Sequence, residues 1–250
     1  MLVPATRHYP NAPITEAVID LRVQPHPQLI MSTLLKVREG NEAQYPTMYP
    51  VNEVYGSMQF AQEKGFSTTA SSQQIGYMFR SADEKQILQA RTTGFSMSQL
   101  APYPHWPPFC IEARRRWDIY RNVAQPEKIV RIAVRYINRI DIPLPIIDFG
   151  EYLRTVPQVS PDLPQGLKNY FMQLEMPLDE IKSYAIINQM MGEQQTRPDI
   201  VSIVLDIDIF RVNDLPTTED EIWVSMEELR HAKNSVFEAC ITDKARELFQ

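Results

Sequence analysis

Glycine is scarce in this sequence, with eight residues among 250. The two common phosphate-binding loops, GxxxxGK[ST] and GxGxxG, need closely spaced glycines, and neither pattern occurs. The GxSxG turn and the histidine patterns HxH and HExxH are also missing. These absences argue against a nucleotide-hydrolysing or hydride-transferring enzyme. They leave open enzymes whose catalytic residues are scattered along the chain.

Cysteine is rarer still, because Cys110 and Cys240 are the only two. A CxxC-type zinc site cannot be built from them, and a disulfide framework is not indicated. We therefore expect no cofactor. Apolar runs are far shorter than the roughly 18 residues of a membrane span, and the opening MLVPATRHYP lacks the pattern of a signal peptide. We expect a soluble, cytoplasmic protein that does not engage a membrane.

Positive charge is also in deficit, since the formal net charge is -6 and the pI is about 5.3. Coating of nucleic acid needs many lysines and arginines to release counterions, so this balance argues against it. A local basic groove stays open. Hydrophobic residues make up 44% of the chain, which is enough for a folded core.

The first half of the chain begins with a strand over 14–23, in which apolar and polar residues alternate. A helix is predicted over 29–40, and Pro107 and Pro108 open another that runs to about Val123. Further strands of this half are predicted at 51–62, 73–82, 85–93 and 95–101.

The second half repeats this order of elements. A long strand is predicted over 129–142, and Asp148 is placed to cap a short helix. Thr217 or Thr218 is placed to cap a later helix, whose inner stripe is Ile222, Met226, Leu229 and Val236. Further strands are predicted at 168–176, 180–191 and 199–212.

The element order predicts an α+β fold of two similarly ordered β-α-β(3–4)-α halves, residues 1–125 and 126–250, forming one composite unit. Two curved antiparallel sheets would join through their first strands, with helices on one side. This is the saddle-like architecture of the TATA-binding protein, used only as an analogy. The pseudo-duplication depends on element order alone, because no residue-level repeat is found.

The strand over 129–142 carries the most informative pattern. Alternation places Arg131, Arg135, Arg139 and Asp141 on one face. Guanidinium groups bind phosphates and carboxylates in two-pronged fashion, so this row is a candidate site for an anion or an acidic partner. The sequence also allows a structural alternative, a cross-strand ladder of ion pairs with the polar face of the first strand. That face carries Glu16, Asp20 and Arg22.

A second candidate is a pair of carboxylates, Asp206 and Asp208, which share one face of the strand at 199–212. Paired carboxylates can hold Mg²⁺ or act as acid and base. Two alternating aspartates alone are a weak signal. They suit equally well as partners of the arginine row, so no metal site is assigned.

Several stretches resemble a sporadically distributed family of uncharacterised bacterial and archaeal proteins. The most specific is the RYINRI segment within Arg131 to Pro143, and weaker ones are Pro13 to Ala17, Phe95 to Tyr103, Glu151 to Leu153 and His231 to Phe249. The resemblance extends over almost the full length. It implies no chemistry, but the patchy distribution of the family is similar to that of bacterial defence or toxin–antitoxin genes.

Three functions follow as hypotheses. The first is a non-enzymatic binding or regulatory subunit that engages a protein partner in a defence-like or toxin–antitoxin-like system. The second is a nucleic-acid or nucleotide binder that uses the arginine-lined face, and the third is a metal-dependent hydrolase at Asp206 and Asp208. A homo-oligomer is a further alternative.

Overall fold

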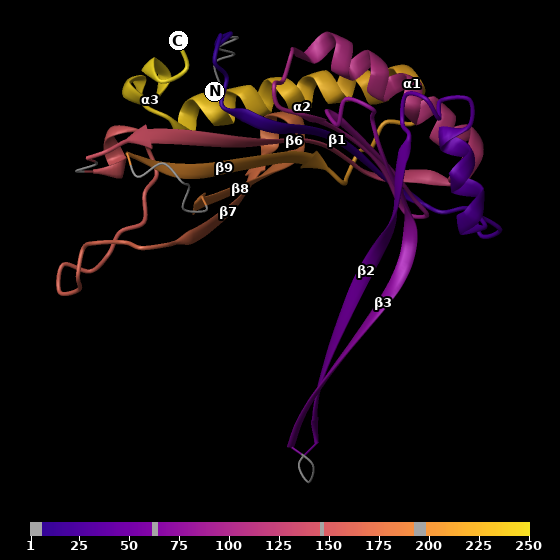
Figure 1. The fold of residues 1–250 in the computed structure, drawn as a ribbon, viewed down its shortest axis with the longest axis horizontal. Coiled ribbons are helices and arrows are strands. Elements are labelled where there is room, and N and C mark those ends of the chain that lie inside the picture. Colours follow the sequence, from indigo (N-terminus) through magenta and orange to yellow (C-terminus); the bar gives the residue numbers. More distant parts are fainter. Residues whose placement is uncertain (1–6, 62–64, 146–147, 193–198) are drawn as a thin grey trace.

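A computed structural model describes residues 7–61, 65–145, 148–192 and 199–250. In this part of the chain, nine strands form one antiparallel sheet in the order β2-β3-β4-β5-β1-β6-β9-β8-β7 (Figure 1). The edges of the sheet are therefore β2 and β7. The strands are β1 (Ile14–Gln24), β2 (Thr47–Ala61), β3 (Gly65–Arg80), β4 (Gln86–Arg91), β5 (Gly94–Leu100), β6 (Lys128–Pro143), β7 (Phe171–Leu178), β8 (Ser183–Met191) and β9 (Ile200–Arg211).

The two long helices lie on the same face of this sheet (Figure 1). Among the described residues, no helix covers the other face, and the β2–β3 hairpin extends on this side far beyond the rest of the sheet. No helix of the described ranges is long and apolar enough to cross a membrane. The helices are α1 (Trp106–Ala124), α2 (Glu219–Cys240) and α3 (Asp243–Glu247), with 3₁₀ turns η1 (Met31–Arg38), η2 (Phe149–Glu151) and η3 (Asp179–Ile181).

The predicted fold class, two β-α-β halves with their own sheets and helices, is wrong. One sheet forms because β1 pairs along most of its length with β6, where Val18 lies opposite Arg135. The helical content is also lower than expected. The division into residues 1–125 and 126–250 stays a prediction, and the β1–β6 pairing crosses it.

The segment predicted as a helix over 29–40 forms the 3₁₀ helix η1 instead. Its apolar residues explain this, because Met31, Leu34 and Val37 recur every three positions and pack on the core, while Leu35 is exposed. A 3₁₀ helix has three residues per turn, so this spacing aligns them on one side.

The helix predicted after Asp148 is only the three-residue turn η2. Asp148 does cap it, since its side chain accepts a hydrogen bond from the Gly150 N–H. The chain then leaves the helical conformation to pair with the segment after α2, where Leu153 forms a bridge with Ile241. Pairing with a distant segment thus ends the helix.

Alternation decides which face of the central strands is buried. In β1, Ala17, Ile19 and Leu21 are fully buried against the helices, as the sequence pattern predicts. Helix α1 closes the core above them through one apolar stripe, and Phe95 of β5 packs edge-to-face on Trp117 of this stripe. The stripe residues, all at most 2% exposed, are Phe109, Ala113, Trp117 and Tyr120.

Helix α2 begins at a capping box. The Thr218 hydroxyl accepts a hydrogen bond from the Glu221 N–H, and the Glu221 carboxylate accepts one from the Thr218 N–H. Two otherwise unpaired backbone donors are satisfied in this way. The predicted cap is thereby confirmed at Thr218.

Replacing Thr218 with alanine is expected to lower the free energy of unfolding by about 1 kcal/mol, because one backbone donor of α2 loses its acceptor. Urea unfolding followed by circular dichroism measures this. Thr217→Ala is the matched control, since its backbone N–H bond to Glu221 is retained, and it should cost no more than a few tenths of a kcal/mol. Equal losses in the two variants would contradict the assignment.

Candidate functional site

The uncovered face of the sheet carries the arginine row that the sequence predicts. Arg131, Arg135 and Arg139 all project from β6 to this side, because the residues between them, such as Tyr136, turn toward the helices. Their side chains are 14%, 46% and 28% exposed in that order. Their availability to a ligand therefore depends on what each guanidinium already binds.

Arg131 is the most enclosed of the three. Its guanidinium donates to Asp208 at 2.5 Å and to Asp20 at 3.1 Å, and it lies 4.6 Å from the centroid of the Phe210 ring. Asp20 also accepts a hydrogen bond from Arg91 at 2.6 Å. Burial raises the pKa of Asp208 despite the nearby guanidinium. The group is an ion network that spans four strands, β1, β4, β6 and β9.

Arg135 makes a two-pronged ion pair. Its Nε and Nη2 atoms donate to the two carboxylate oxygens of Asp206, both at 2.7 Å. The hydrogen bonds with Asp206 raise the pKa of Arg135. Asn188 of β8 donates to the same carboxylate at 3.0 Å. The fork of the guanidinium is thereby filled, although almost half of the side chain faces solvent.

Arg139 is engaged by its own strand and by β9. It donates to Asp141 at 2.9 Å and to the Ser202 hydroxyl at 2.6 Å. Ser202 in turn donates to Asp141 at 2.6 Å. These three residues form a closed triangle of hydrogen bonds.

The polar residues predicted on the first strand differ in burial and in the partners that they contact. Asp20 joins the Arg131 network, and Arg22 lies 3.4 Å from Asp20 with a side chain that is 57% exposed. Glu16 is half-buried beside Ile137, and its charge contributes to the raised pKa of Arg135. The structure therefore brings the predicted residues onto one face, and β1, β6 and β9 all supply carboxylates to the arginine row.

Charges of the two signs balance in the middle of this face. The guanidinium groups of β1, β4 and β6 are matched in number by the carboxylates of β1, β6 and β9, and a phosphate would have to displace carboxylates already bound. The arginines are Arg22, Arg91, Arg131, Arg135 and Arg139, and the carboxylates are Glu16, Asp20, Asp141, Asp206 and Asp208.

Asp206 and Asp208 do lie on one face of β9, but each is bound to a different arginine. Within the described ranges, no group of three or more histidine, cysteine and acidic side chains is arranged to hold a metal ion. Cys110 and Cys240 are unpaired thiols, and burial raises the pKa of each to about 11. Neither is suited to be a thiolate nucleophile.

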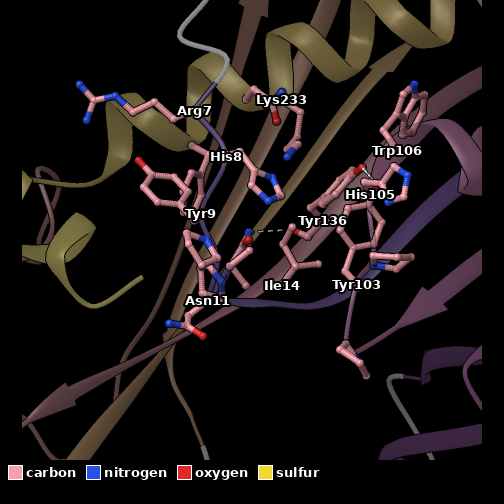
Figure 2. Close-up of a pocket in the computed structure, with 18 of the residues that line it drawn as sticks. Arg7, His8, Tyr9, Asn11, Ile14, Tyr103, His105, Trp106, Tyr136 and Lys233 are labelled. Carbon is pink, nitrogen blue, oxygen red and sulfur yellow. Dashed lines mark hydrogen bonds between the residues drawn. The ribbon is translucent and has the colours of Figure 1, made fainter. Parts of the chain in front are cut away.

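A second site lies on the helix side of the sheet, and sequence reasoning missed it. A cavity of about 720 Å³ opens between the C-terminal half of α2, the residues that precede β1, the loop from β5 to α1, and the helix-facing side of β6 (Figure 2). Its size falls in the usual range for small-molecule pockets. Residues that define its walls are His8, Tyr9, Tyr103, Trp106, Tyr136 and Lys233.

Lys233 is the most unusual residue of this cavity. Its side chain is directed from α2 toward Tyr136 and His8 (Figure 2), and only 6% of the residue is exposed. The Nζ atom lies 3.6 Å from the centroid of the Tyr136 ring. Burial lowers the pKa of Lys233 to about 7, with Arg230 adding to this effect and Glu238 opposing it.

Two tyrosines form the wall opposite α2. The hydroxyl groups of Tyr103 and Tyr136 are 2.8 Å apart and share one hydrogen bond. Burial raises the pKa of Tyr103 to about 12 and that of Tyr136 well above its ordinary value, so both stay protonated at neutral pH. The pair therefore keeps one hydroxyl proton that can be donated elsewhere.

One signal in the sequence points to Lys233. The inner stripe of α2 includes Leu229 and Val236, and Lys233 lies four residues after the first and three before the second. A lysine at such a position must be buried along the stripe. Its depth depends on what covers the helix, which periodicity does not show.

No family model matches the chain, and no curated protein matches it significantly. The function therefore has to be argued from the two sites themselves.

Proposed function

We propose that this chain is a non-enzymatic binding protein, and that it holds a protein partner against the uncovered face of its sheet. The observation that carries the proposal is the pair of exposed aromatic residues at the two ends of this face. Tyr49 on the edge strand β2 is 46% exposed, and Phe171 on the edge strand β7 is 63% exposed. Both lie on the uncovered side.

The positions of these aromatic residues support contacts with a partner at both edges of the sheet. Tyr49 lies opposite Met78, which faces away from the helices because its neighbour Phe79 is fully buried in the core. Phe171 lies opposite Met190 on the same face. Exposed aromatic residues are enriched at protein interfaces, because they bury a large area at low entropic cost.

The balanced charges of the middle of the face support a protein partner over a nucleic acid. Arg131, Arg135 and Arg139 are each bound to carboxylates, so few counterions would be released on contact with phosphates. A protein surface of mixed charge needs no such release. The family resemblance adds a setting to the proposal, a regulatory subunit in a defence-like or toxin–antitoxin-like system.

The test compares Tyr49→Asp and Phe171→Asp with wild type. The tagged full-length chain is purified from its native cells after cross-linking, and the cross-linked positions are mapped by mass spectrometry. We expect a defined partner whose cross-links lie on β2, β7 and the sheet between them. Each substitution places a charge in the interface and should reduce recovery of this partner at least about tenfold.

Val224→Asp is the matched control, because Val224 is 61% exposed on α2 and lies on the opposite side of the molecule. It should recover the partner as well as wild type does. Cross-links confined to α1 and α2, or equal recovery by all variants, would refute the proposal. A concentration-dependent doubling of mass in light scattering, without any other protein, would identify a second copy as the occupant instead.

A further inference from the structure

We propose that the cavity beneath α2 is a binding site for a small organic carboxylate, with the Lys233 ammonium group as its counter-ion and the aromatic walls around its apolar part. The site lies on the helix side of the sheet, so it is independent of the partner-binding face. The argument depends on a buried charge that has no partner, on the other charges nearby, and on the shape of the walls.

The charge of Lys233 is not matched by the protein. In the described residues, its Nζ atom forms no ion pair or hydrogen bond with a side chain, and its contact is with the face of the Tyr136 ring. A buried ammonium group normally has a carboxylate partner or loses its proton. An anion in the cavity would take the place of that missing partner.

The nearest carboxylate of the cavity wall is already in use. Glu238 accepts hydrogen bonds from Tyr9 at 2.6 Å and from Arg246 at 2.8 Å. Arg230 pairs with Glu227 at 3.3 Å. Arg7, the other arginine of the wall, is exposed to solvent. Lys233 is therefore the buried cation of the wall that an incoming anion can neutralise.

The hydroxyl pair gives the anion a second donor. Tyr103 and Tyr136 have two hydroxyl protons and share one hydrogen bond between them, so one proton remains for a ligand oxygen. One ammonium group and one hydroxyl suit the two oxygens of a single carboxylate. A dianionic phosphate would need more donors than this pair of groups supplies.

The remaining walls suit an apolar body. Trp106 packs edge-to-face on Phe109, and Tyr103 packs edge-to-face on both Phe109 and Tyr136. Rings that are held in this way form rigid walls, and an aromatic or aliphatic group can stack on them. The ligand class is therefore a monocarboxylic acid with an aromatic or branched apolar group.

The probes are phenylacetate, 3-phenylpropanoate, hexanoate and acetate, with phenylacetamide as the neutral analogue and phenyl phosphate as the dianionic one. Binding to the full-length protein is measured by isothermal titration calorimetry. Its location is measured by the NMR shift of the Trp106 indole N–H, with the Trp117 indole N–H as a remote reference. We expect phenylacetate, 3-phenylpropanoate or hexanoate to bind saturably and to move the Trp106 signal alone.

Lys233→Met should weaken that binding at least about tenfold, since a charge-assisted hydrogen bond is lost. Tyr103→Phe keeps the ring and removes one hydroxyl, and it should weaken binding by a smaller factor. Arg135→Met, on the other face of the sheet, should leave it unchanged. Phenylacetamide should bind at least about tenfold more weakly than phenylacetate.

Three outcomes would overturn the inference. The first is that no carboxylate binds at concentrations up to about 20 mM, a limit that would still detect a Kd of about 1 mM. The second is that wild type and Lys233→Met bind equally well. The third is that phenyl phosphate binds more tightly than any carboxylate. None of them bears on the aromatic residues of the partner-binding face, so failure here and failure there are distinguishable.

Discussion

Lys233→Met is expected to stabilise the folded protein by about 3 kcal/mol at pH 6. The pKa of Lys233 falls from 10.5 to about 7 on folding, and this difference corresponds to about 4 to 5 kcal/mol of destabilisation wherever the lysine is charged. Loss of the contact with the Tyr136 ring, at about 1 to 2 kcal/mol, offsets part of the gain. Methionine fills a similar volume without a charge.

The dependence on pH has a definite sign. The folded-state pKa lies below the unfolded-state value, so the unfolded chain binds more protons between about pH 7 and pH 10. The free energy of unfolding of wild type therefore rises with pH across this window, relative to the variant. The charged groups that act on the lysine are Arg230 and Glu238, and the Tyr136 ring faces it from β6.

Urea unfolding of wild type and Lys233→Met at intervals from pH 6 to pH 10 measures the effect. Titrating groups that are common to both proteins cancel in the difference between their free energies of unfolding. The difference should shrink toward zero, or reverse, at pH 10. Lys182→Met is the matched control, since Lys182 is 72% exposed in an ion pair with Asp214, and it should change stability by less than about 1 kcal/mol. A difference between wild type and Lys233→Met that is constant with pH would contradict the assignment of a buried, unpartnered ammonium group.

Among substitutions on the uncovered face of the sheet, Arg131→Met is expected to lower the free energy of unfolding the most, by about 3 to 5 kcal/mol. Asp20 and Asp208 would then lose the guanidinium group that neutralises both carboxylates, and their side chains are only 14% and 17% exposed. Removal of Arg131 leaves Asp208 desolvated and without its cation partner, whereas Asp20 keeps its ion pair with Arg91. Equilibrium unfolding at pH 7 measures the loss.

Arg22→Met is the matched control for this network, because Arg22 also lies close to Asp20 but its side chain is 57% exposed. Its loss should cost less than about 1 kcal/mol. Adding Asp208→Asn to Arg131→Met should restore part of the stability, since it removes the uncompensated carboxylate. The deficit of Arg131→Met should also be smaller at pH 4 than at pH 7, because protonated carboxyls need no cation. Additive effects in the double variant would count against a coupled network.

Much of the local structure could be predicted from the sequence. Alternation in β1 and β6 identifies the buried face of each strand, and the threonine before α2 identifies its first turn. These features depend on residues close together in the chain, and backbone geometry alone relates them. The same local reasoning places Arg131, Arg135 and Arg139 on one face.

The fold class could not be predicted in the same way, because it depends on pairing between distant strands. Periodicity does not show that β6 lies between β1 and β9 and unites the strands in one sheet. Nor does it show that the Leu34 segment winds as a 3₁₀ helix, since short apolar spacings of three and four residues overlap. Element order alone therefore led to a fold class of two halves with separate sheets, and the single nine-stranded sheet contradicts it.

The partners of the arginine row were predicted only in part. The sequence pointed to the carboxylates of β1, and Asp20 does bind Arg131. Asp206 and Asp208 of β9, which the sequence also allowed as partners of the row, bind Arg135 and Arg131, and Asp141 of β6 binds Arg139. The sequence did not show which carboxylate binds which arginine, because this depends on β9 being the second neighbour of β6. Lys233 was missed for a related reason, since its lack of a counter-ion depends on three segments that meet only in the folded chain.

The pairing of β1 with β6 also determines when the sheet can form. Val18 pairs with Arg135, so the middle of the sheet closes only after more than half of the chain has left the ribosome. Contacts between residues so distant in sequence slow folding, because a long loop must be closed before they stabilise anything. Until β6 emerges, one edge of β1 has no strand to pair with, and the growing chain carries an unprotected edge that invites association with other chains.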